Sequence, residues 1–149
     1  MDEGNTLREK SGDSNSYQAG DEINALKWNL VTKNAATRNY FKGLISLRAA
    51  HPAFRMEKAS DVKSNVKFLK SSNDVIAYSI NGSAVGDSWS LIVVIHNASS
   101  KSSTVSLPKK DNWNVVVDGK QAGIKVVKSL PSASQVQVPA LSTMVIYTK

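Results

Sequence analysis

The 149-residue sequence contains no cysteine, only two histidines and only four prolines. The lack of cysteine excludes a disulfide framework, a thiol nucleophile and a cysteine-ligated zinc or iron–sulfur site. The two histidines, His51 and His96, are far apart in the sequence, and no metal-ligand spacing accompanies either of them. The sequence therefore predicts no metal and no cofactor. It leaves the compartment open between secreted, cell-surface and cytoplasmic, because a secreted bacterial protein can also lack cysteine.

Long apolar runs are missing as well. The longest covers residues 91–95, whereas a membrane-spanning helix needs about 20 apolar residues. The first five residues have neither the basic nor the apolar segment of an export signal. We therefore expect no membrane partner and no export signal within this sequence.

The positive charge is spread out rather than clustered. The formal net charge is +7, but the lysines after residue 56 are scattered, and Asp111 directly follows the one adjacent pair, Lys109 and Lys110. A surface that binds phosphates usually has clustered charge with arginine and stacking aromatics. We therefore predict a solvated basic surface and no nucleic-acid partner.

The hydrophobic period changes near residue 56. Before it, residues 36, 40, 41, 44, 45 and 48 recur at three- and four-residue spacing, which predicts a helix over 34–50. Thr32 is the expected cap, and His51 followed by Pro52 is expected to end the helix. Residues 1–30 are rich in turn formers and predict a long loop with one helical turn around 22–26.

After residue 56 the sequence consists of short β-rich runs separated by turn formers, with a helical turn expected near 60–64. The run at 91–95 is apolar on both faces and predicts a central strand. The fold class we predict is all-β, an antiparallel β-sandwich of about eight strands preceded by a loop and one helix. The expected strands are 66–69, 75–80, 89–96, 103–107, 113–118, 124–128, 135–138 and 143–148.

Candidate catalytic groups are few. Acidic residues gather in the first loop, but no strand holds two of them at a fixed separation, as a glycosidase acid/base pair requires. We therefore interpret Asp2, Glu3, Glu9, Asp13, Asp21 and Glu22 as a solvated acidic loop. Trp89 and Trp113 begin strands, which favours packing in the core or at an edge over a sugar-stacking platform. His96 is expected to be structural, and the dipole of the preceding helix accounts for His51.

Several motifs, in one order along the chain, closely resemble the C-terminal part of type I pullulanases, the bacterial starch-debranching glycoside hydrolases of the α-amylase superfamily. They lie at 13–17, 20–24, 28, 40–48, 51–55, 73–78, 89–97, 113–123 and 138–147.

This resemblance implies a fragment of a larger enzyme. Residues 1–55 would be a remnant of the catalytic (β/α)₈ barrel, the loop after strand eight and the last helix, and 56–149 would be the C-terminal β-sandwich. The carboxylates that cleave α-1,6-glucosidic branch points in pullulan, starch or glycogen would lie upstream, so no residue here is assigned a catalytic role. The implied partners are the barrel of the same polypeptide and, through the intact parent, an α-glucan.

Loops at the C-terminal face of such barrels form the substrate groove, so the resemblance makes Asn15, Tyr17, Asp21 and Asn24 candidates for contacting glucose units. Their alternative role is local, because Asn and Asp in such loops often hydrogen-bond their own backbone. An independent carbohydrate-binding module remains an alternative and would need an exposed, coplanar aromatic platform. An adhesion-type sandwich also fits the strand pattern, but it does not account for the helix and loop motifs.

Overall fold

The computed structural model describes residues 7, 9–72 and 74–149, so Asp2 and Glu3 of the acidic loop lie outside the described residues. The chain divides into two compact units, one that ends at Lys42 and one that covers Gly43–Lys149. Each unit is described by itself.

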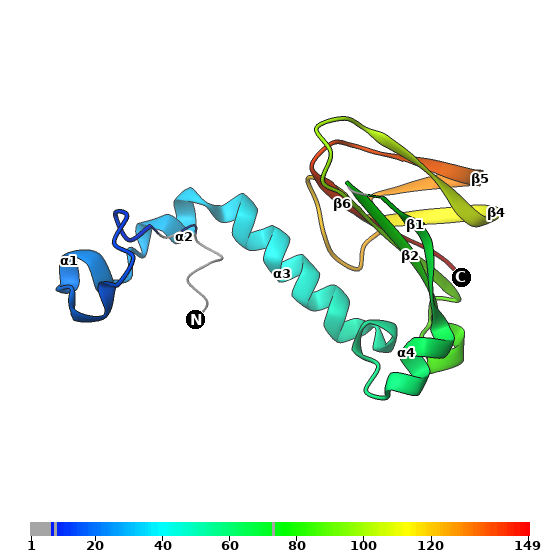
Figure 1. Ribbon diagram of the computed structural model, residues 1–149, viewed down its shortest axis with the longest axis horizontal. Helices are drawn as coiled ribbons and strands as arrows, with labels where there is room; N and C mark the ends of the chain where they lie inside the picture. Colours follow the sequence, from blue (N-terminus) through cyan, green and yellow to red (C-terminus); the bar gives the residue numbers. More distant parts are fainter. Residues whose placement is uncertain (1–6, 8, 73) are drawn as a thin grey trace. The chain divides into compact units, whose positions relative to one another are not determined.

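The first unit contains loop segments, short helices and the beginning of a longer helix (Figure 1). The helices are η2 (Ser16–Gln18), α1 (Asp21–Asn24) and α2 (Asn29–Lys33). The expected helical turn near 22–26 is confirmed as α1, but α2 was not predicted. Thr32 lies inside α2, so its prediction as a helix cap is wrong. Asn34 joins the helices instead, because its N–H donates to Leu30 O at 2.9 Å and its carbonyl accepts from Arg38 N at 3.1 Å.

The predicted long helix is confirmed as α3 (Ala35–Ala50), whose second half belongs to the second unit. It ends where expected, because His51 is extended (φ −118°, ψ 108°) before Pro52. A single turn of 3₁₀ helix, η3 (Pro52–Arg55), and then α4 (Ala59–Asn65) lead to the sheet. The helical turn expected at 60–64 is therefore confirmed as well.

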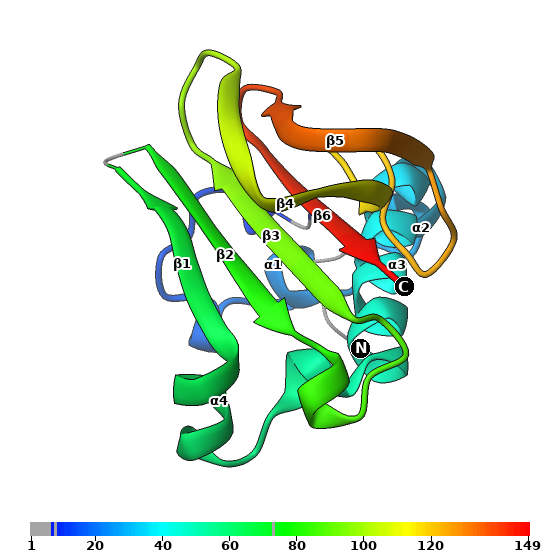
Figure 2. The same ribbon diagram turned by 90° about the vertical axis from the view of Figure 1, so that its right-hand side faces the viewer.

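The described part of the second unit contains one antiparallel sheet of six strands in the order β1-β2-β3-β6-β4-β5 (Figure 2). A short 3₁₀ helix, η4 (Ser83–Val85), follows β2. The strands are β1 (Val66–Ser71), β2 (Val75–Asn81), β3 (Leu91–Asn97), β4 (Ser103–Val117), β5 (Lys128–Val138) and β6 (Ser142–Thr148). The predicted all-β class is confirmed, and β3 is central, as expected.

The expected count of eight strands is wrong, for two reasons. Residues 103–107 and 113–118 were predicted as separate strands but form the single strand β4, which runs through Pro108. Proline is tolerated there because the register of β4 with β5 shifts between Ser106 and Asp111. Residues 124–127 lie outside every strand, and the residues near 135–138 are the end of the longer strand β5.

The core lies on one face of β2, β3 and β6. Residues from β4 and β5 pack against that face, so the sheet folds over itself into two layers (Figures 1 and 2). The core residues are Val75, Ala77, Val93, Ile95, Val105, Leu107, Trp113, Val115, Val136, Val138, Met144 and Ile146. At one margin, Lys70 of β1 reaches β4, where its Nζ donates to Ser103 Oγ at 3.0 Å.

Candidate functional site

The first unit contains the four residues predicted to contact glucose, and the structure gives Asn24 a local role. Asn24 Nδ2 donates to Ser16 O at 2.8 Å and also to Ala19 O, so this side chain ties α1 to the turn at η2. Lys10 Nζ donates to Ser16 Oγ at 2.6 Å and, at 3.4 Å, to Asn24 Oδ1. The loop around Ser16 is therefore held by its own polar groups, and Asn24 is a loop anchor.

The other three candidates are exposed in the same loop. Tyr17 is 82% exposed, and Asn15 and Asp21 are exposed as well. The backbone N–H of Asn15 donates to Asp13 Oδ1 at 2.8 Å, which forms an Asx turn. Asp21 lies in the first turn of α1. The four residues thus share one polar loop, and three of them are accessible to a ligand.

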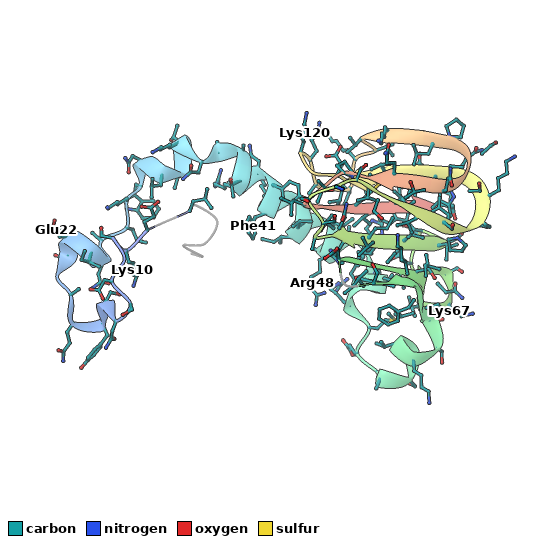
Figure 3. All side chains as sticks on the ribbon, turned by 45° about the horizontal axis from the view of Figure 1, so that its top comes forward. Lys10, Glu22, Phe41, Arg48, Lys67 and Lys120 are labelled. Atoms are coloured by element: carbon teal, nitrogen blue, oxygen red, sulfur yellow. The ribbon has the colours of Figure 1, made fainter. Side chains whose placement is uncertain are left out.

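Two further exposed apolar side chains follow this loop. Trp28 is 60% exposed and Leu26 is 44% exposed. A pocket elsewhere in this unit is lined by Leu7, Glu9, Lys27, Leu30, Lys33 and Asn34, so it contains none of the four predicted residues. Figure 3 shows the side chains of this unit, with Lys10 and Glu22 labelled.

The second unit has a buried polar cluster at Asp87, in the turn between η4 and β3. His51 Nδ1 donates to Asp87 Oδ1 at 2.8 Å, Trp89 N donates to the same oxygen at 2.9 Å, and Ala53 N donates to Asp87 Oδ2 at 3.1 Å. The Asp87 side chain is completely buried. One carboxylate therefore joins the end of α3 and the start of η3 to the turn before β3.

The hydrogen bonds favour the charged form of this carboxylate. Burial alone raises the pKa of Asp87, but the hydrogen bonds from His51, Trp89 N and Ala53 N outweigh it, so the pKa lies below its ordinary value of 3.8. Asp87 is ionised at neutral pH. The side chain is completely buried, and three donors within the protein already bond its oxygens, which indicates a structural role.

Three rings stack beside this carboxylate. The centroids of His51 and Trp89 are 3.5 Å apart, and those of Trp89 and Tyr147 are 3.9 Å apart with an interplanar angle of 10°. Trp89 is 6% exposed and Trp113 is fully buried. The prediction that both tryptophans pack in the protein is confirmed, and neither offers a ring face to a sugar.

Two glycines permit close approaches in this region. A Cβ on Gly43 of α3 would lie 1.9 Å from the carbonyl oxygen of Ala122, in the loop after β4. A Cβ on Gly82 would lie 2.2 Å from Trp89 O. A side chain at Gly43 would displace the helix from this loop, so α3 and the loop after β4 fit closely here.

Sequence reasoning missed Asp87 and its pairing with His51. His51 was explained by the helix dipole alone, and its partner lies 36 residues later. A usable signal was present, because the turn formers Gly86 and Asp87 lie two to three residues before Trp89 and shortly before the apolar run at 91–95. His96, by contrast, is exposed on β3, and its Nδ1 lies 2.9 Å from Thr143 Oγ1.

Among residues 7, 9–72 and 74–149, no group of three or more His, Asp or Glu side chains is arranged to hold a metal ion. Within the same residues, no helix combines the length and the apolar character needed to span a bilayer.

Residues 62–121 match the protein family described as "Pullulanase, all-beta domain". A pullulanase of Bacillus subtilis (strain 168) is 38% identical to this chain over 112 residues, which cover 75% of this chain and 16% of the relative.

Solved structures show the same similarity. The pullulanase from Bacillus acidopullulyticus aligns with a TM-score of 0.90 and 37% identity, covering 97% of this chain and 17% of its own. The type I pullulanase from Bacillus subtilis str. 168, solved in complex with maltose, aligns with a TM-score of 0.88 and 32% identity, covering 98% of this chain and 20% of its own. This chain therefore spans about a fifth or less of the length of these relatives.

Proposed function

Because this chain belongs to the pullulanase family, whose all-β domain it contains, we propose that it is the non-catalytic C-terminal part of a debranching enzyme that cleaves α-1,6-glucosidic bonds. The parent enzyme would act on pullulan, starch or glycogen. The chain itself would hold the catalytic part in place and would not cleave the substrate.

The observation that carries this proposal is the extent of the structural similarity. Nearly the whole chain, including its helices and loops, aligns with a small part of two pullulanases. An independent β-sandwich module would be expected to match over its strands alone. The alignment of the first unit thus favours a piece of a larger enzyme over a free-standing binding module.

The faces of α3 support the same proposal. Gly43 and Leu47 lie one turn apart, and Gly43 meets the loop after β4 while Leu47 is buried. Phe41 and Ile45 lie about 200° from Gly43 and Leu47 around the helix, and they are 39% and 61% exposed. A helix with apolar residues on two opposite faces is suited to lie between two bodies, as the last helix of a barrel followed by another domain would.

We place the boundary between the barrel remnant and the β-sandwich domain at residues 55 and 56. Residue 55 ends η3, the last element before the chain turns to α4 and the sheet. The loop and α3 before this boundary would belong to the catalytic barrel, which is the proposed partner within the same polypeptide. The His51–Asp87 pair would then join the barrel's last helix to the sandwich.

The proposed substrate partner is an α-glucan bound by the intact parent. A relative was solved with maltose bound, and Asn15, Tyr17 and Asp21 offer amide, ring and carboxylate groups that suit glucose hydroxyls and ring faces. Asn24 would contribute by holding this loop. The alternative of an independent carbohydrate-binding module is not favoured, because Trp89 and Trp113 are buried.

The test has two arms. The purified 149-residue chain is assayed for release of reducing ends from pullulan, and we expect none. Turnover that follows the protein through repurification would contradict the proposal.

The second arm uses the longer polypeptide that contains this chain. Asp21→Ala should lower kcat/KM for pullulan by about fivefold to tenfold, the effect of losing one or two hydrogen bonds to the substrate. The matched control is Glu22→Ala, a neighbouring exposed carboxylate. Unchanged kinetics together with a lower melting temperature would make Asp21 a loop anchor.

A further inference from the structure

The connection between β2 and β3 begins with the one Asn-Gly pair of the sequence, Asn81-Gly82. Asparagine is a thermolabile residue. Its side-chain amide can be attacked by the backbone nitrogen of the next residue, and a following glycine favours the attack because it has no side chain to obstruct it. Asn81 is exposed at the end of β2, where it pairs with Leu91 of β3 (Figure 2). Water can therefore reach the side chain that would react.

The carbon that would be attacked, Asn81 Cγ, is polarised in the folded chain. Ser83 Oγ donates to Asn81 Oδ1 at 3.0 Å. A hydrogen bond to an amide oxygen draws electron density away from the amide carbon, which makes this carbon more electrophilic. The side-chain half of the reaction is therefore in place in the folded structure.

The nitrogen that would attack is held back by the fold. Gly82 is buried, and its N–H donates to Ser90 O at 3.0 Å. A nitrogen whose proton is hydrogen-bonded inside the protein does not readily lose it. The extended backbone of Asn81 in β2 also keeps this nitrogen from closing a five-membered ring with Asn81 Cγ. The reaction therefore needs the turn over residues 82–90 to open.

The buried Asp87 holds this turn closed. Asp87 N donates to Gly82 O at 3.0 Å, and the Asp87 carboxylate accepts from Trp89 N at 2.9 Å and from His51 and Ala53. A Cβ on Gly82 would lie 2.2 Å from Trp89 O, so a side chain at this position would displace the backbone. The packing that requires glycine at position 82 thus also creates the reactive pair.

We propose that Asn81-Gly82 is a site of spontaneous deamidation whose rate is set by opening of the 82–90 turn. When the turn opens, the Gly82 nitrogen loses its proton to hydroxide and attacks Asn81 Cγ. The new N–C bond closes a succinimide ring, the bond from Cγ to the side-chain nitrogen breaks, and that nitrogen takes a proton from water and leaves as ammonia. Water then hydrolyses the ring at either of its two carbonyls, which yields aspartate or isoaspartate at position 81. This inference is independent of the proposed function.

The isoaspartate product changes the turn itself. It carries the main chain through the former side chain, which lengthens the backbone by one carbon between β2 and Gly82. Gly82 can then no longer keep both of its bonds, to Ser90 O through its N–H and from Asp87 N through its carbonyl. Deamidation therefore loosens the turn that carries Asp87 and weakens the junction of this turn with the end of α3.

The reaction is measured in the 149-residue chain, incubated in mildly alkaline buffer with and without guanidinium chloride. Peptide mass spectrometry after digestion at acidic pH quantifies the product at Asn81. We expect the rate to be at least about tenfold lower in the folded chain than in the denatured chain, because the folded chain reacts only through local opening. Asn112, an exposed asparagine followed by Trp113, is the internal control and should stay unmodified in both.

Two variants test the role of the turn. Asp87→Ala removes the carboxylate that holds the turn, so it should raise the rate at Asn81 in the folded chain by at least about tenfold. Ile95→Ala destabilises the core of the same sheet at a residue outside the turn, so it should leave this rate unchanged. His51→Ala removes one of the three donors to Asp87 and takes the place of Asp87→Ala if that variant does not fold.

The effect of the product is measured on the modified chain. Deamidation adds one negative charge, so ion exchange separates modified from unmodified protein, and the isoaspartate form should melt at a lower temperature than the unmodified chain. An unchanged melting temperature would contradict the loosening of the turn.

Three further results would overturn the proposal. An unmodified Asn81 in the denatured chain would show that the Asn-Gly pair is not reactive. Equal rates in the folded and denatured chains would show that the turn does not control the reaction. Equal acceleration by Asp87→Ala and Ile95→Ala would show that the reaction follows unfolding of the whole sheet rather than opening of the turn.

Discussion

The two units of this chain are stabilised in different ways. The second unit has a continuous apolar core, with Ile95, Trp113 and Ile146 completely buried. In the described part of the first unit Ser16 is the one buried residue, and polar contacts from Lys10 and Asn24 hold the loop around it. Burial of apolar surface is the main source of folding free energy, so the second unit can fold by itself. The first unit is expected to depend on a neighbour.

The largest expected effect comes from the core of the second unit. Ile95→Ala removes a completely buried side chain from the central strand and should lower the free energy of unfolding by about 3 kcal/mol. The counterpart in the first unit is Leu26→Ala, at a position that is 44% exposed. This substitution should change the free energy of unfolding by less than about 0.5 kcal/mol. Urea denaturation followed by tryptophan fluorescence measures both. Similar losses for the two variants would mean that the first unit has a core of its own.

The next effect concerns the carboxylate that joins α3 to the sheet. Asp87→Ala leaves the Nδ1 of His51 and two backbone N–H groups buried without their acceptor, and loss of such a partner costs about 3 kcal/mol. The control is Asp111→Asn, which breaks the more exposed pair with Lys109 (2.6 Å) and should leave stability unchanged within error. An equal loss in both variants would contradict the special role of Asp87.

The same residue predicts a pH dependence with a definite sign. The pKa of Asp87 in the folded protein lies below the ordinary value of 3.8, so the folded state favours the ionised carboxylate. Its contribution is fully present above the unfolded pKa of about 4 and is lost as the pH falls through the lower folded pKa. The difference in stability between the wild-type chain and Asp87→Asn should therefore shrink from pH 5 towards acid. A difference that stays constant over this range would show that the carboxylate charge contributes nothing.

The third effect concerns the close approach between α3 and the loop after β4. Gly43→Ala gains about 1 kcal/mol of helix propensity, but its Cβ would lie 1.9 Å from Ala122 O. Displacement of the backbone should cost about 2–3 kcal/mol, which leaves a net loss of roughly 1–2 kcal/mol. Gly20→Ala in the first unit is the matched control, because no atom lies within 4 Å of its Cβ position. A stabilised Gly43→Ala variant would mean that α3 and this loop are not held against each other.

Local patterns predicted most of the fold. The three- and four-residue spacing identified α3, and the apolar run at 91–95 identified the central strand, because both signals arise from burial on a regular element. Residues 103–107 and 113–118 were predicted as two separate strands, yet β4 runs through the residues between them. A register shift with β5 accommodates Pro108, and such a shift depends on the partner strand rather than on local sequence.

The junction between helix and sheet could not be predicted in this way. Asp87 acquires its role from His51 and Ala53, which are more than 30 residues away and become neighbours only in the folded chain. Glycine is a poor helix former, yet Gly43 lies inside α3, because a Cβ at this position would collide with the carbonyl oxygen of Ala122. In the first loop, the family resemblance implied glucan contacts, and the structure shows that the Asn24 side chain donates to backbone carbonyls of its own loop. Whether Asn15, Tyr17 and Asp21 contact a glucan stays a prediction.

The smallest expected effect is also the most direct test of the difference between the units. Deleting residues 1–42 removes the first unit but retains Gly43, Leu47 and His51. The remaining chain should unfold cooperatively, with a thermal midpoint within about 2 °C of that of the intact chain. A change of a few tenths of a kcal/mol in the free energy of unfolding shifts the midpoint by only about that much. Deleting residues 1–54 should also leave a cooperative sheet. It additionally removes His51 and Ala53, so that chain should be less stable by about 3 kcal/mol, because Asp87 loses their hydrogen bonds and Trp89 loses the ring that stacks on it. Calorimetry of the three chains distinguishes the outcomes. If neither deletion lowered the midpoint, the His51–Asp87 pair would contribute nothing to the stability of the second unit. If deletion of residues 1–42 already abolished the unfolding transition, the second unit would need the first unit to fold.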